Sequence, residues 1–195
     1  MSRVALILVE GETEEEFYSL LIHHHCRSHP KHIKNLHGNF SINKKIVDAS
    51  VQYANNNPDR EFDVYVCIDQ ERLGCPAYNH TLCESELKKH PQFKSLIPVV
   101  AVLMCESLFF LDIDGIYKFL RAPKQSRKPS NFKCHYRFTH HDLSKLFKSF
   151  GKTYRKGTKC QNFVSNLDLK KMLHAKEIFH LITSLQASAP KQSPR

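Results

Sequence analysis

Near its N-terminus the chain reads VALILVEGETEEEFY over residues 4–18. Residues 4–9 form a continuous apolar run, which is typical of a strand buried on both faces of a parallel sheet. The run ends at Glu10 and Gly11, and Thr13 is expected to cap an amphipathic helix over residues 13–27 with glutamates in its first turn. The segment predicts a strand–turn–helix unit that brings Glu10 to the carboxyl edge of a sheet, where open α/β folds bind ligands.

The same pattern recurs along the first 120 residues. Further apolar strands are predicted over 62–68, ending at Asp69, and over 97–104, ending near Glu106, with a short strand over 39–42. Helical spacing predicts helices over the ranges 43–55, 81–89 and 107–120. Alternating strands and helices indicate an α/β fold, a Rossmann-like parallel sheet flanked by helices.

The character of the chain changes after residue 120. A basic loop covers 121–137, Thr139 or His140 opens a helix to about residue 150, and 167–185 is amphipathic and helical. We therefore expect an α/β core over 1–122 and a C-terminal helical extension over 123–187 that packs on it. Residues 188–195 are expected to be a disordered tail.

Composition narrows the class of protein. The chain has 195 residues, 41% of them hydrophobic, which suits one domain with a substantial core. No segment approaches the run of roughly 20 apolar residues that spans a bilayer, and the N-terminus lacks signal-peptide features. The seven cysteines include no Cys-x-x-Cys pair and are expected to be reduced. These features predict a cytoplasmic protein with no membrane partner.

Acidic side chains follow three of the predicted strands. Glu10 follows the first, Asp69 and Glu71 the second, and Glu106 the third. Because the carboxyl ends of parallel strands share one edge of a sheet, these acids are expected to converge. Hard oxygen ligands of this kind suit Mg²⁺ or Mn²⁺, which can activate water and stabilise charge on a phosphodiester.

The net charge of +10 fits either an anionic partner or a basic surface that serves only solubility. Basic residues far outnumber acids between Lys118 and Lys176, and a basic surface beside an acidic pocket suits a polyanion bound near metal ions. The residues predicted to bind nucleic acid, either DNA or RNA, are Arg121, Lys124, Arg127, Lys128, Arg155 and Lys159.

The run VEGETEE over residues 9–15, followed by a strand that ends in an Asp-x-acid pair, resembles the Toprim domain of topoisomerases, primases and overcoming-lysogenization nucleases. Within that superfamily the chain is most similar to the small DUF4276 and RloB-like Toprim proteins. Two later segments support this placement, CESLFFL over residues 105–111 and the triplet Tyr154-Arg155-Lys156.

The resemblance implies roles for individual residues. Glu10 would be the first metal ligand or an acid/base group beside the metal, and Glu14 would match the second glutamate of the overcoming-lysogenization nucleases. Asp69 would bind metal. Glu71 stands where the family pattern has Asp, which keeps the charge but lengthens the side chain. Lys156 would stabilise charge at the scissile phosphate or contact a phosphate.

Glu106 and Tyr154 are possible additions to this site.

The sequence is compatible with three functions. The first is a Mg²⁺-dependent nuclease, the effector of an antiphage defence system, with Glu10, Asp69 and Lys156 as catalytic residues. The second is a non-catalytic nucleic-acid-binding subunit held by a partner. The third is an enzyme acting on a small phosphate ester or a nucleotide. The resemblance also implies a homodimer. It implies in addition a P-loop ATPase, which would be a separate partner because the chain has no Walker motif.

Overall fold

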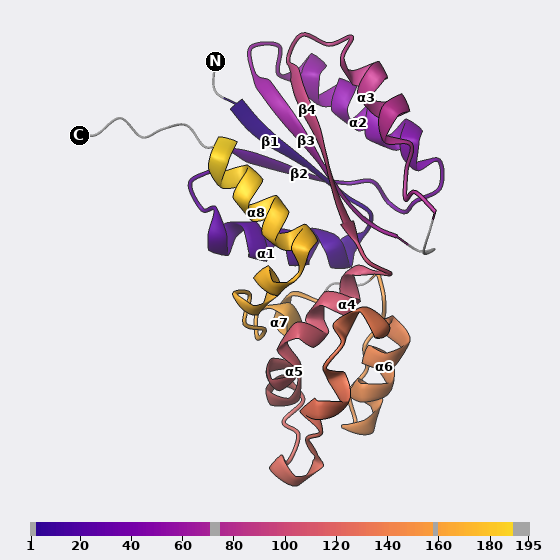
Figure 1. The fold of residues 1–195 in the computed structure, drawn as a ribbon, viewed down its shortest axis with the longest axis vertical. Helices are drawn as coiled ribbons and strands as arrows, with labels where there is room; N and C mark the ends of the chain where they lie inside the picture. Colours follow the sequence, from indigo (N-terminus) through magenta and orange to yellow (C-terminus); the bar gives the residue numbers. More distant parts are fainter. Residues whose placement is uncertain (1–2, 71–74, 158–159, 189–195) are drawn as a thin grey trace, which may run out of the picture.

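The computed structural model describes residues 3–70, 75–157 and 160–188. At its centre is a four-stranded, fully parallel sheet with strand order β2-β1-β3-β4 (Figure 1). The strands are β1 (Arg3–Val9), β2 (Lys31–Asn35), β3 (Glu61–Asp69) and β4 (Phe93–Ala101). The predicted α/β class, a parallel sheet flanked by helices, is confirmed.

Alternation along the strands divides the sheet between two hydrophobic layers. On β1, Ala5, Ile7 and Val9 face the layer that contains α1 (Glu12–His25) and α8 (Lys176–Ser188). Val4, Leu6 and Leu8 face the other layer, which contains α2 (Ile42–Asn56) and α3 (His80–Leu87). Both faces are therefore covered, which explains why the central strands read as continuous apolar runs.

Beyond the carboxyl edge of the sheet, the chain forms a helical extension (Figure 1). Its elements are α4 (Cys105–Phe109), η1 (Phe110–Asp112), α5 (Ile113–Phe119), η2 (Lys124–Ser126), η3 (Pro129–Phe132), η4 (His135–Arg137), α6 (His140–Ser149), α7 (Gln161–Val164) and η5 (Lys171–His174). The ring of Phe109 lies 5.4 Å from that of Phe17 in α1 and 5.5 Å from that of Phe163 in α7. The extension thus shares a core with the α1 face of the sheet.

Two long helices expected in this region are divided in the structure. The range 107–120 becomes α4, η1 and α5, because Asp112 leaves the helical backbone region with φ −118° and ψ 60°. The range 167–185 is divided before α8 by Ala175, which is extended with φ −81° and ψ 130°. Thr139 does cap α6, in a capping box with Asp142.

Two expectations near the N-terminus are wrong. The residue before α1 is Gly11, and Thr13 lies within the first turn instead of capping it. The short strand expected over 39–42 is absent, because His37, Gly38 and Ser41 have positive φ angles that a strand does not allow. The edge strand lies earlier, at β2, whose polar sequence hides it from an apolar pattern.

Within residues 3–70, 75–157 and 160–188, no helix combines the length and apolar character that a bilayer crossing requires.

Candidate metal centre

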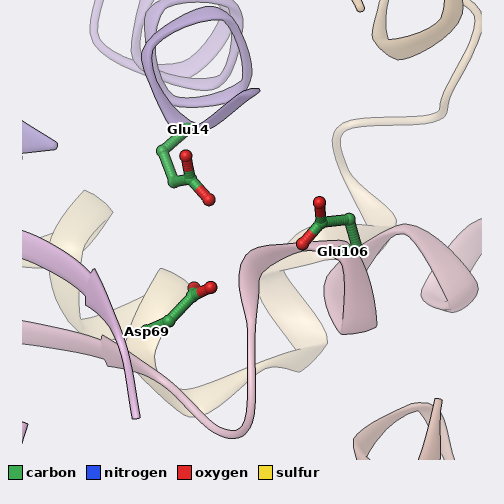
Figure 2. A group of neighbouring side chains, drawn as sticks. All are labelled: Glu14, Asp69 and Glu106. Carbon is green, nitrogen blue, oxygen red and sulfur yellow. The ribbon is translucent and has the colours of Figure 1, made fainter. Parts of the chain in front are cut away.

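Three buried carboxylates from three different elements point into one space at the carboxyl edge of the sheet (Figure 2). Glu14 comes from the first turn of α1, Asp69 is the last residue of β3, and Glu106 is the second residue of α4. One carboxylate oxygen from each lies within 4.8 Å of the others. This spacing allows all three residues to contact one cation.

A hydrogen bond fastens two of these elements together. The backbone N–H of Cys105, the first residue of α4, donates to Asp69 Oδ1 at 2.7 Å. Because this bond ties the start of α4 to the end of β3, the next residue, Glu106, is held beside Asp69. The bond leaves Asp69 Oδ2 free of backbone partners among the contacts that the described residues form.

The surroundings of the centre disfavour negative charge. Burial, with repulsion from Glu106 and Glu10, raises the pKa of Glu14 to about 7. Burial and repulsion from Glu14 also raise the pKa of Asp69 well above its ordinary value. Gathering three acids at a site that penalises their charge has no packing benefit, whereas a bound divalent cation would offset the penalty.

The hydrogen bonding of the cluster is incomplete in the part of the chain that the structure describes. Glu14 Oε1 and Glu106 Oε2 are buried without a hydrogen-bond partner there. Buried carboxylate oxygens normally have partners, because leaving one unsatisfied costs about 1–3 kcal/mol or more. Both oxygens belong to residues of the three-carboxylate group, so they are suitable as cation ligands.

A segment far along the chain closes the centre. The hydroxyl of Tyr154 donates to Glu106 Oε1 at 2.9 Å, and Lys156 Nζ lies 3.4 Å from Asp69 Oδ2. Burial lowers the pKa of Lys156, but attraction to Asp69, Glu106 and Glu14 outweighs it, so the net pKa is raised and the ammonium stays charged. The resemblance-based prediction had named Tyr154 and Lys156, and the structure places both at the acids.

This closing segment is anchored on α1 by contacts that the sequence analysis missed. The backbone N–H of Gly157 donates to Thr13 Oγ1 at 3.2 Å, and that of Cys160 donates to a carboxylate oxygen of Glu16. Thr13 was expected to be a helix cap. The partners are 144 residues apart in sequence, so no local pattern could have revealed these contacts.

The remaining predicted metal residues occupy different positions. Glu10 follows β1 at the same edge, and its charge acts on both Glu14 and Asp69, but its oxygens are not in the group of three. Glu106, predicted as an additional residue, is in that group. Glu71, predicted as a metal ligand, lies outside the described residues.

The predicted nucleic-acid-binding residues fall into two places. Arg121, Lys124, Arg127 and Lys128 belong to the part of the extension farthest from the sheet (Figure 1). The guanidinium of Arg127 donates two hydrogen bonds of 2.9 Å to the carbonyl of Ala122, so it has a role in the local fold. Arg155 is exposed next to Lys156 in sequence. Lys159 lies outside the described residues.

The fold and the site together define a class, an α/β protein with a buried three-carboxylate centre at the carboxyl edge of a parallel sheet. The chain belongs to the protein family described as domain of unknown function DUF4276, which it matches over residues 9–186. No curated protein and no solved structure matched the chain.

Proposed function

We propose that this protein is a metal-dependent nuclease that cleaves phosphodiester bonds of DNA or RNA, as the effector of an antiphage defence system. The observation that carries the proposal is the group formed by Glu14, Asp69 and Glu106, buried and within 4.8 Å of one another. The Toprim relationship expected from the sequence agrees with it, because Toprim nucleases place acids at this edge of a parallel sheet.

The donor set suits Mg²⁺ or Mn²⁺. All three groups offer hard carboxylate oxygens, and two of those oxygens are buried without partners among the described residues. Glu14, Asp69 and Glu106 would hold the ion, with Glu10 beside them. A bound divalent ion of this kind supplies an activated water and neutralises charge on a phosphodiester during transfer.

The protein's own side chains have separate tasks in this proposal. The Lys156 ammonium, beside Asp69, contacts the phosphate of the substrate and stabilises negative charge on it. Tyr154 is a positioning residue, since its hydroxyl fixes the carboxylate of Glu106. Glu10, whose charge acts on Glu14 and Asp69, would be an acid/base group beside the ion.

A cleavage assay tests the proposal. Purified protein is incubated with labelled single-stranded DNA, duplex DNA, bulk tRNA and mononucleotides, with Mg²⁺ or Mn²⁺ or with EDTA. We expect metal-dependent cleavage of a polymer, and a loss of about 100-fold or more in Glu14→Gln, Asp69→Asn and Glu106→Gln, because even residues that only support metal ligands commonly cost 10–100-fold. Glu10→Gln measures the contribution of the fourth acid.

The matched control is Glu12→Gln, which removes an exposed glutamate from the same turn of α1. It should retain full activity, and circular dichroism should show that every variant is folded. Cleavage that survives all three ligand substitutions would refute the site. Binding of nucleic acid without cleavage would favour a non-catalytic subunit with a separate ATPase, and turnover of mononucleotides alone would favour a phosphoesterase.

A further inference from the structure

A basic groove lies between the edge strand β2 and helix α2, neither of which contributes a residue to the group of three carboxylates. Two adjoining cavities of about 520 and 630 Å³ form it. They share four lining residues, including Lys34 from β2 and Gln52 from α2. We call this feature the β2–α2 groove.

The charges that line the groove are almost all positive. Lys31, Lys34, Lys45 and Arg60 are there, against a single acid, Asp48. In the described part of the chain, none of these four cations forms an ion pair with a carboxylate. Because positive residues outnumber the one acid among the lining residues, the groove favours a polyanion as its ligand.

Two of the cations are available to a ligand. Lys31 and Lys45 donate to backbone carbonyl groups, which orients them. By contrast, Lys34 and Arg60 are exposed, and within the described residues their side chains form no hydrogen bond. They are therefore the phosphate contacts that a ligand would meet without breaking an existing interaction.

The groove also offers an aromatic surface. The exposed ring of His32 lies 5.5 Å from that of the buried Tyr53, with a tilt of 35° between them. His32 and Lys34 are two residues apart on a strand, so they stand on the same face, roughly 6.6 Å apart along it. A cation next to a supported ring is the arrangement with which proteins bind a phosphate and stack an unpaired base.

One end of the groove reaches the carboxyl edge of the sheet. Asn35, which lines it, donates to Glu15 Oε2 at 3.0 Å, and Glu15 is adjacent to the metal-centre residue Glu14. His37 lines the same end, and the backbone N–H of its neighbour Gly38 donates to the carbonyl of Glu10 at 2.7 Å. This end of the groove therefore lies at the same edge of the sheet as the three carboxylates.

We infer that the β2–α2 groove binds the phosphate backbone of a single-stranded nucleic acid and leads it to the metal centre, with Lys34 and Arg60 contacting phosphates and His32 stacking on a base. The choice of nucleic acid as ligand rests on the proposed function. The groove is a separate site from the basic loop of the extension.

Binding is measured by fluorescence anisotropy with a short fluorescein-labelled single-stranded oligonucleotide, in DNA and RNA forms, in EDTA so that no cleavage occurs. We expect Lys34→Glu/Arg60→Glu to raise Kd about tenfold or more, and to make the salt dependence shallower by roughly 0.7 per lost phosphate contact. His32→Ala should raise Kd about fivefold with the salt dependence unchanged.

The control is Lys44→Glu, which reverses an exposed charge on α2 that lines neither cavity. It should change Kd less than the single reversal Lys34→Glu does. An unchanged Kd in the double variant, an equal loss in the control, or equal competition by a duplex of the same sequence would overturn the inference. If the protein binds the oligonucleotide through the groove but cleaves no substrate, the proposed nuclease function is refuted. The inference that the groove binds nucleic acid is then still supported.

Discussion

The ammonium of Lys156 lies 3.4 Å from Oδ2 of Asp69, although 87 residues separate the two in sequence. The Asp69 side chain is 1% exposed and that of Lys156 is 33% exposed, so a partly exposed ammonium lies next to a buried carboxyl group. One ammonium can balance only one of the three clustered carboxylates. The centre therefore has an excess of acid that a divalent cation is suited to balance.

The stability of the metal-free protein should fall as pH rises. The ordinary pKa of the Glu14 carboxyl is 4.5, and in the fold it is about 7. Between these values the folded state binds more protons than the unfolded state, so the free energy of unfolding decreases with pH. The shift corresponds to about 3 kcal/mol, present below pH 4.5 and lost above pH 7. Urea unfolding in EDTA across this range measures it.

Glu14→Gln should flatten that pH profile and make the metal-free protein more stable than the wild type at pH 8. Glu12→Gln, the exposed neighbour, should leave the profile unchanged. Mg²⁺ should raise the Tm of the wild type more at pH 8 than at pH 5, because protons and metal compete for the same carboxylates. A wild-type stability that rises from pH 5 to pH 8 in EDTA would contradict the assignment.

Lys156→Met should strengthen metal binding while it weakens cleavage. Two unit charges about 4 Å apart in water interact by about 1 kcal/mol, and Mn²⁺ carries two charges, so removing the ammonium beside Asp69 should lower the Kd for Mn²⁺ about fivefold or more. Isothermal titration calorimetry measures this Kd. The exposed Lys145→Met, on α6, is the control and should leave it unchanged. Weaker Mn²⁺ binding in Lys156→Met would show that the lysine supports the ion.

Tyr154 and Glu106 should be energetically coupled. Tyr154→Phe keeps the ring that packs against Phe147 and Phe163 but removes the donor to the buried Glu106 Oε1. We expect it to lower the free energy of unfolding in EDTA by about 1–3 kcal/mol. A double-mutant cycle with Glu106→Ala, which removes the acceptor, should give a coupling above about 0.5 kcal/mol, and simple additivity would argue against the hydrogen bond.

Gly115→Ala should destabilise the extension. A Cβ at position 115 would lie 2.0 Å from Oδ2 of Asp112, the same oxygen that accepts from the backbone N–H of Asp168 at 2.7 Å. Overpacking of this kind costs about 1–3 kcal/mol, which urea unfolding would detect. Adding Asp112→Ala removes the obstacle, so the double variant should lose less stability than the sum of the two single changes. Strict additivity would show that the helix adjusts elsewhere.

Local sequence was sufficient for the two central strands of the sheet. The apolar runs ending at Glu10 and Asp69 predicted β1 and β3 correctly, because strands buried on both faces leave a clear pattern. The pattern failed for β2, a polar edge strand, and for the helices around Asp112 and Ala175. Around Asp112 and Ala175 the backbone leaves the helical conformation. The spacing of apolar residues along the sequence does not reveal such breaks.

The acids at the ends of the strands also followed from the sequence, since a parallel topology brings carboxyl ends to one edge. Which of those acids meet was decided by tertiary structure. The bond from the Cys105 N–H to Asp69 holds Glu106 beside it, burial in the first turn of α1 aims Glu14 inward, and Glu10 is left at the side. The physical reason is that side-chain convergence depends on long-range hydrogen bonds and packing, which spacing along one chain does not encode.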